Sequence, residues 1–447
     1  MPETTKNNVT ETPLSRRRFL QFGAAVGAAA AASTALGSTA SAAARRSPFV
    51  SSGKSLNVIC EAGGSLELTP ITALFKKMTG NTVNLIELPY NGLYNRAYSE
   101  MSTGSVTFDI LAGDAIWIPT FAPGLVPINS FFTSAVKGDY FPATLQEAQY
   151  KGNYYGIPQW TNVEILYYRK DLFESTAEQK NFKAKYGYDL APPVTWQQFT
   201  DAAEFFTRGS ALYGTDVKAD VETEYLATVL QAGSPGVVLA DNGSIIIDNA
   251  QHLAALEFYS GLNNKLHVAP PGAVEAGWAQ AQTLFYDGKT AMTRFWGHLY
   301  RQIPSSSKVY GKVGVAPMIS GPAGVAGIPG PYYLSIPKAS PNASLAMEFL
   351  NFCYAHGQLS ADTGLGLVSR ISQFKAYENK PGFAAYKPML ETLNAPQTKT
   401  RPTSPQWQQI VNEVLVPMLQ KSIGSNVNYA AVLAGGKANL EKILNQI

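Results

Sequence analysis

Few residues of this 447-residue chain have the types and spacing that catalysis or metal binding requires. No Ser-His or Cys-His arrangement stands out, and no two carboxylates are marked by spacing as an acid–base pair for glycan hydrolysis. The thiols and imidazoles are scattered, without the separations of a metal site: Cys60, Cys353, His252, His267, His298 and His356. The sequence therefore predicts no catalytic residues, no metal and no cofactor.

Polar and aromatic residues follow three predicted strands. Residues 55–60, 82–88 and 108–113 are predicted as strands, and apolar residues at helical spacing predict helices over 66–79 and 91–103. This βαβαβ order predicts a parallel sheet with right-handed crossovers. Ligands of such sheets bind beyond the carboxyl ends of the strands, which places three loops at the expected site: Glu61–Gly64, Pro89–Asn91 and Asp114–Trp117.

Length and charge limit the class of protein. The chain is longer than one hydrophobic core usually holds, so two domains are expected. Its net charge is +3, and beyond the N-terminal segment it has no basic run, which argues against a nucleic-acid partner. Cys60 and Cys353 would be free to pair in an oxidising compartment or to stay as buried thiols, and the sequence does not decide between these states.

The first 44 residues are expected to be a secretory signal. Ser15–Leu20 contains three arginines before Phe and Leu, an Ala/Gly-rich run follows, and Ala40–Ala42 has the form of a cleavage site. The paired arginines predict twin-arginine export to the periplasm. A membrane anchor is the alternative, disfavoured because the run has hardly any large apolar residue. Cys60 lies too far from this run to carry a lipid anchor.

The stretch Gly156–Leu172 joins a predicted turn to a predicted strand. Gly156 and Pro158 predict the turn, and the alternation of apolar residues from Val163 to Tyr167 predicts the strand. We expect the chain to cross here from one lobe to another, with Trp160 and Glu164 near the gap. The rest is mainly helical, with predicted strands at 291–296, 312–317 and 332–336.

Several short motifs occur in a fixed order along the chain. They are Asp114–Trp117, Tyr155–Pro158, Tyr167–Phe173, Pro192–Trp196, Phe285–Met292, Trp296 and Gly327–Ser340. Each is weak alone, but the ordered set resembles the extracellular solute-binding proteins of ABC importers. The resemblance runs from about Ser55 to the C-terminus and is to the sugar-binding cluster that includes maltose- and trehalose-type binders.

The resemblance implies an α/β fold of the two-lobe periplasmic-binding-protein type. Each lobe would hold a mostly parallel sheet flanked by helices, and three crossover segments would form a hinge that closes over a ligand. The crossovers would be Gly156–Leu172, Tyr310–Val315 and Tyr354–Ser360. The N-terminal lobe would comprise residues 55–159 and 314–353, and the C-terminal lobe residues 160–313 and 354–447.

The resemblance also implies a sugar site, in which aromatic faces and polar groups meet C–H faces and hydroxyls. Each candidate has an ordinary alternative. It is a helix N-cap for Asp114, a salt bridge for Arg370, and solvated surface for Glu61 and Asn91. For the aromatic residues Trp117, Trp160, Trp296 and Tyr225 it is core packing. Pro331 departs from the Gly pair of relatives and puts a backbone contact there in doubt. The candidates are Asp114, Trp117, Trp160, Trp296, Tyr332, Arg370, Glu61, Asn91 and Tyr225.

The function implied is that of a non-catalytic, monomeric protein that delivers a mono- or oligosaccharide to a membrane permease. The same fold with a polyol, glycerol phosphate or a polyamine-like solute is an alternative, and an exported glycan-acting enzyme is another. A phosphate ligand would call for basic residues, for which Arg294 and Arg370 are the obvious candidates.

Overall fold

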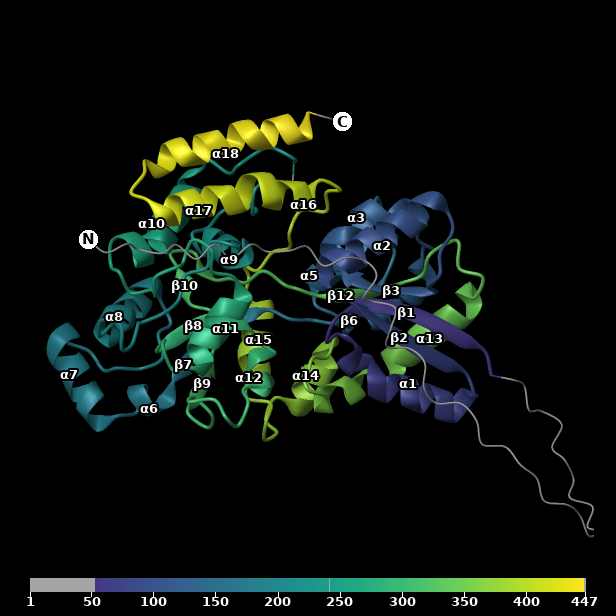
Figure 1. Cartoon of the computed structure of the whole chain (residues 1–447), viewed down its shortest axis with the longest axis horizontal. Coiled ribbons are helices and arrows are strands. Elements are labelled where there is room, and N and C mark those ends of the chain that lie inside the picture. The colour runs from purple at the N-terminus through teal and green to yellow at the C-terminus, as the bar shows by residue number, and fades with distance from the viewer. Residues whose placement is uncertain (1–52, 241, 446–447) are drawn as a thin grey trace, which may run out of the picture. The chain divides into compact units, whose positions relative to one another are not determined.

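Two β-sheets with their covering helices form the framework of the chain (Figure 1). The computed structural model describes residues 53–240 and 242–445. The predicted signal peptide, residues 1–44, lies outside the described residues. Within them, no helix is long and apolar enough to cross a membrane.

The first sheet has the strand order β2-β1-β3-β12-β6. β1 is parallel to both β2 and β3, which confirms the predicted βαβαβ unit. β12 is antiparallel to β3 and to β6, so four of the five strands run in one direction. The bounds are β1 (Ser55–Glu61), β2 (Thr82–Leu88), β3 (Ile110–Asp114), β6 (Ile157–Trp160) and β12 (Tyr332–Ser335).

Alternation along the strands gives this sheet two buried faces. Val58 packs into a cluster with α1 (Ser65–Thr79) and α13 (Ala343–His356), and Ile59 packs into the cluster around α2 (Tyr90–Thr103). Successive side chains of a strand point to opposite faces, so a run of apolar residues requires cover on both. The helices supply that cover.

The second sheet has the order β8-β7-β9, and β7 is antiparallel to both neighbours. The expectation of a mostly parallel sheet in each lobe is wrong here. Parallel pairing in this part of the described chain occurs as isolated bridges, Tyr213 with Thr290 and Thr195 with Ser320. The bounds are β7 (Glu164–Arg169), β8 (Met292–Trp296) and β9 (Val313–Ala316).

Helices cover both faces of the second sheet. Leu166 packs with the larger helical cluster, and Ile165 and Tyr167 pack with the opposite one. Thr195 caps α8, since its side chain accepts a hydrogen bond from the Gln198 N–H. The longer helices of this part are α7 (Thr176–Tyr186), α8 (Trp196–Phe206), α9 (Thr223–Gln231), α10 (Ala250–Asn264), α11 (Trp278–Tyr286), α15 (Tyr386–Leu393), α17 (Val416–Gly424) and α18 (Tyr429–Leu444).

Several sequence predictions fail locally. The predicted turn at Gly156–Pro158 is wrong, because Pro158 lies in β6, an edge strand, where a missing N–H is tolerated. In the C-terminal part, which is predicted as mainly helical, α14 covers only Ile371–Tyr377. A π-helical segment (Val411–Leu415) lies between α16 (Trp407–Ile410) and α17 (Val416–Gly424). β9 belongs to the second sheet, so the chain returns to the first sheet later than the expected crossover at Tyr310–Val315.

The remaining elements are short and connect these layers. They are the strands β4 (Gln149–Tyr150), β5 (Asn153–Tyr154), β10 (Ser320–Gly321) and β11 (Gly324–Val325), and the helices α3 (Ile118–Phe121), α4 (Ser134–Gly138), α5 (Pro142–Glu147), α6 (Lys170–Phe173), α12 (Leu299–Gln302) and α16 (Trp407–Ile410). The 3-10 helices are η1 (Ala115–Trp117), η2 (Ala122–Gly124), η3 (Asn129–Phe131) and η4 (Gly357–Asp362).

Candidate ligand-binding site

Four of the predicted site residues meet at one edge of the first sheet. Glu61, Asp114 and Trp160 are the last residues of β1, β3 and β6. Tyr332 is the first residue of β12, which runs the other way and therefore starts at the same edge. In the sheet register Tyr332 lies between Asp114 and Trp160. We call these four residues the edge group.

Within the edge group an aromatic stack lies beside a carboxyl group. The rings of Trp160 and Tyr332 have centroids 4.5 Å apart and an interplanar angle of 26°. The Tyr332 hydroxyl donates a hydrogen bond to Glu61 Oε2. Burial raises the pKa of the Glu61 carboxyl, and the hydrogen bond from Tyr332 opposes that rise. Burial and the nearby acids raise the pKa of the Tyr332 hydroxyl, which keeps it a donor.

Asp114 is held from three directions. Its Oδ1 accepts hydrogen bonds from the Ile116 N–H at 3.3 Å and from Arg401 Nη2 at 3.2 Å, and its Oδ2 accepts one from the Tyr90 hydroxyl at 3.1 Å. Arg401 also places its Nε 3.6 Å from Glu147 Oε1. Burial raises the pKa of Glu147 to about 8, although Arg401 lowers it.

Arg401 is a residue of this site that the sequence did not predict. It lies between α15 and α16, far along the chain from both acids, and no local motif marks it. Only the fold brings its guanidinium, 6% exposed, to the end of β3.

Trp296 comes to the same place from the second sheet. It ends β8, is partly exposed, and its ring packs against Gly330, two residues before Tyr332. A Cβ atom on Gly330 would lie 2.7 Å from that ring, so only glycine allows this approach. The Trp278 ring lies 5.5 Å from the Trp296 ring.

The other four predicted residues are not brought into this group. Trp117 is buried in a cluster with Tyr90, Tyr94 and Phe121. The Tyr225 hydroxyl is buried 3.0 Å from His252 Nδ1. Arg370 pairs with Asp139 at 3.2 Å, and Asn91 is exposed at the start of α2. Their ligand contacts remain predictions.

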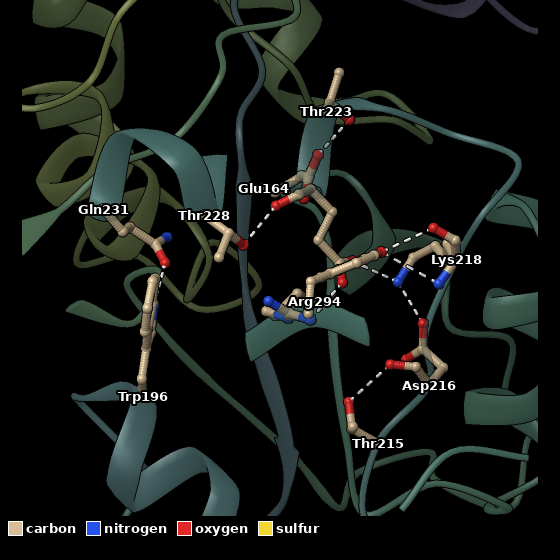
Figure 2. Close-up of polar contacts among 11 residues, drawn as sticks. Glu164, Trp196, Thr215, Asp216, Lys218, Thr223, Thr228, Gln231 and Arg294 are labelled. Carbon is tan, nitrogen blue, oxygen red and sulfur yellow. Dashed lines mark hydrogen bonds and ion pairs between the residues drawn. The ribbon is translucent and has the colours of Figure 1, made fainter. Parts of the chain in front are cut away.

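A second set of charged side chains lies inside the body built on the second sheet. Figure 2 shows Arg294 between Glu164 and Lys218, with Asp216 beyond Lys218. Lys218 Nζ donates to Glu224 Oε2 at 2.6 Å and also pairs with Asp216, and Arg294 Nη2 lies 2.6 Å from Glu224 Oε1. All these side chains are at most 2% exposed. Glu164, expected near the gap between lobes, is fully buried here.

The edge group does not include a metal-binding cluster among the residues that the structure describes. No group of three or more His, Cys, Asp or Glu side chains within residues 53–240 and 242–445 has the arrangement of a metal site. Two surface hollows lie elsewhere. One of about 450 Å³ is next to the β4-β5 hairpin, and one of about 470 Å³ is next to Asp216 and α11. Trp160 and Tyr332 are 6% and 9% exposed, whereas Glu61 and Asp114 are partly exposed, so most of the edge group is buried.

Comparison with known proteins identifies the family to which the chain belongs. Residues 53–359 match the family of bacterial extracellular solute-binding proteins, and the chain belongs to that family. A probable ABC transporter-binding protein of Deinococcus radiodurans is 26% identical over 291 residues, which cover 62% of this chain and 66% of that relative.

Solved structures show the fold. Maltose-bound MalE3 of T. maritima is similar with a TM-score of 0.74 and 23% identity, covering 88% of this chain and all (100%) of that one. A solute-binding protein of Agrobacterium radiobacter K84 in complex with ribitol has a TM-score of 0.71 and 22% identity, covering 88% and 99%. The predicted two-lobe α/β fold is thus confirmed.

Proposed function

We propose that this chain is the solute-binding component of an ABC importer and that it binds a carbohydrate or a sugar alcohol. It would be exported, act as a monomer without catalysis, and deliver its ligand to a membrane permease. Membership of the solute-binding family supports the transport role. The maltose and ribitol named for two structural neighbours support the class of ligand.

The observation that carries the proposal is the edge group with Trp296 next to it. Stacked aromatic rings offer apolar faces to the C–H faces of a sugar, and carboxylates accept hydrogen bonds from its hydroxyls. Glu61 uses Oε2 for Tyr332, which leaves Oε1 for a ligand hydroxyl. We assign ligand contact to Glu61, Asp114, Trp160, Tyr332 and Trp296.

An anionic ligand such as glycerol phosphate fits less well. A phosphate site needs basic groups that are not already neutralised. Arg294 is paired with Glu224, Arg370 with Asp139, and Arg401 with two acids. Carboxyl groups therefore outnumber available cations around the edge group, which favours a neutral ligand rich in hydroxyls.

Because most of the edge group is buried, a ligand can reach it only if the structure opens. We propose that the two sheets belong to lobes that separate to admit the ligand and close over it, as ligand-stabilised closure requires. The N-terminal lobe would be residues 55–159 and 314–353, and the C-terminal lobe 160–313 and 354–447. The pairing of β9 with β7 favours moving the boundary at 314 to a position after Ala316.

A binding assay tests this function. We expect the melting temperature of the mature chain to rise with the concentration of maltose, ribitol or a related sugar, because a ligand of the native state stabilises it. Trp296→Ala should abolish the shift. Tyr259→Phe is the matched control, since it removes a buried hydroxyl that donates to the Lys218 carbonyl at 2.8 Å and should leave binding intact. A shift with glycerol phosphate and with no sugar or sugar alcohol would refute the proposal.

A further inference from the structure

A short segment, Thr161–Val163, ties together the parts of the chain that link the two sheets. The Thr161 N–H donates to the Val368 carbonyl at 2.9 Å, and its hydroxyl donates to the Ser369 carbonyl at 3.2 Å. Val163 forms an antiparallel bridge with Pro329. The segment follows β6 of the first sheet and precedes β7 of the second, and we call it the junction.

Asn162 is the polar centre of the junction. It is 5% exposed, so its amide must find partners within the protein. Its Oδ1 accepts hydrogen bonds from the Val163 N–H at 3.0 Å and the Gly297 N–H at 3.1 Å. Its Nδ2 lies 2.8 Å from His298 Nδ1 and is the donor of that hydrogen bond. Burial lowers the pKa of His298 to about 4, which keeps the ring neutral and Nδ1 an acceptor.

The hydrogen-bond partners of Asn162 lie close to Trp296. Gly297 and His298 are the two residues that follow it, and both are bonded by the Asn162 side chain. The Gly297 N–H is shared with the Val163 carbonyl at 3.0 Å, so the junction holds it twice. The Asn162 carbonyl accepts the Gly330 N–H at 2.8 Å, and Gly330 is the residue on which the Trp296 ring packs. Asn162 thus holds both the chain after Trp296 and the surface beneath its ring.

We propose that Asn162 is a positioning residue that fixes the Trp296 ring to the junction between the sheets. The position of this aromatic ring then follows the movement of the junction. A ligand that contacts Trp296 would therefore favour one arrangement of the junction over another. The effect of a ligand on the junction rests on the proposed function. The role of Asn162 in placing the Trp296 ring does not depend on that function.

The test needs no ligand. Each tryptophan of the mature chain is labelled with 5-fluorotryptophan, and the ¹⁹F resonance of Trp296 is assigned from its loss in Trp296→Phe. We expect Asn162→Ala to shift that resonance and to leave the resonance of the core residue Trp407 in place. Asn428→Ala is the matched control. It removes the side-chain hydrogen bond that caps α18, and it should leave the Trp296 resonance unchanged.

A second variant keeps the test decisive if Asn162→Ala does not fold. Asn162→Asp retains an oxygen for the Val163 and Gly297 N–H groups and places a carboxylate beside His298 Nδ1, which raises the pKa of that imidazole. The Trp296 resonance should then titrate together with His298. A Trp296 resonance that is unchanged in Asn162→Ala, or that does not follow His298 in Asn162→Asp, would overturn the proposal.

The effect of Asn162 on ligand binding is measured in a separate experiment. For a sugar that binds the wild type, Asn162→Ala should weaken binding by about tenfold, the scale of one buried hydrogen bond, and Asn428→Ala should not. If no sugar binds any variant, the proposed function fails while the ¹⁹F result still decides the role of Asn162.

Discussion

Two groups of buried charges in this protein share their chemistry and differ in what surrounds them. Lys218, Arg294 and their acids belong to elements packed around the second sheet. Arg401 instead joins Asp114 at the end of β3 and Glu147 in α5, both packed with the first sheet. The neighbours of Arg401 in sequence, α15 and α16, pack with the second sheet and its helices.

Because their surroundings differ, the two groups of buried charges should have different structural roles. If the proposed lobes separate, the partners of Glu224 would move together and its ion pairs would persist. The pairs of Arg401 would join the two proposed lobes and would break on opening. A buried ion pair gives little net stability, and leaving one partner unpaired is costly. The inner group therefore favours a unique fold, and the Arg401 group favours one arrangement of the two bodies.

The largest expected effect is that of Arg294→Met. It leaves Glu224 buried with only Lys218 as a counter-ion, and we expect a loss of about 3–5 kcal/mol in the free energy of unfolding. Chemical denaturation measures this loss. Lys437→Ala is the control, because its pair with Asp248 at 3.0 Å is more than a third exposed. That exposed pair should be worth about 0–1 kcal/mol, and equal losses in both variants would remove the distinction.

Arg401→Met should have an intermediate effect on stability, about 1–2 kcal/mol, because Asp114 keeps two other donors and Glu147 can take up a proton. The sharper expectation concerns shape. Without the cation, the ligand-free chain should populate a more open form with a larger radius of gyration in small-angle X-ray scattering. Arg208→Met, which breaks a pair with Glu178 at 2.7 Å within one body, should leave the radius unchanged. An unchanged radius in Arg401→Met would contradict this role.

The smallest expected effect is the pH response of Glu164→Gln. Burial, and then the charge of Glu224, raise the pKa of Glu164 from 4.5 to about 8, while Thr223, Lys218 and Arg294 lower it. A carboxyl whose pKa is raised in the folded state gives stability that is present below its unfolded pKa and lost as pH rises toward the folded one.

Glutamine stays neutral and can still accept the Thr223 hydrogen bond at 2.6 Å. The variant should therefore match the wild type near pH 4 and melt a few degrees higher near pH 8. Thermal melts at several pH values measure the difference. A constant offset between the two proteins at all pH values would show that Glu164 does not titrate in this range.

The parts of the fold that could be predicted are those with local causes. Helical spacing predicted α1 and α2, and the alternation of strands and helices predicted the βαβαβ unit. Strand ends then pointed to Glu61 and Asp114. Long-range packing decided the rest. Whether Trp117 faces a ligand or a core depends on α2, and whether Pro158 makes a turn or an edge strand depends on β12.

The place of β12 has a consequence for how the chain acquires its structure. β12 lies between β3 and β6, so both strands keep an open edge until residues 332–335 have been made. At about 5–20 residues per second, synthesis to that point takes roughly 17–67 s. During this time the early strands present unpaired N–H and C=O groups, which makes them prone to association with other chains. The pairing of β12, the strand that brings Tyr332 to Glu61, is thus a late, non-local step in folding. The first sheet is complete only after this step.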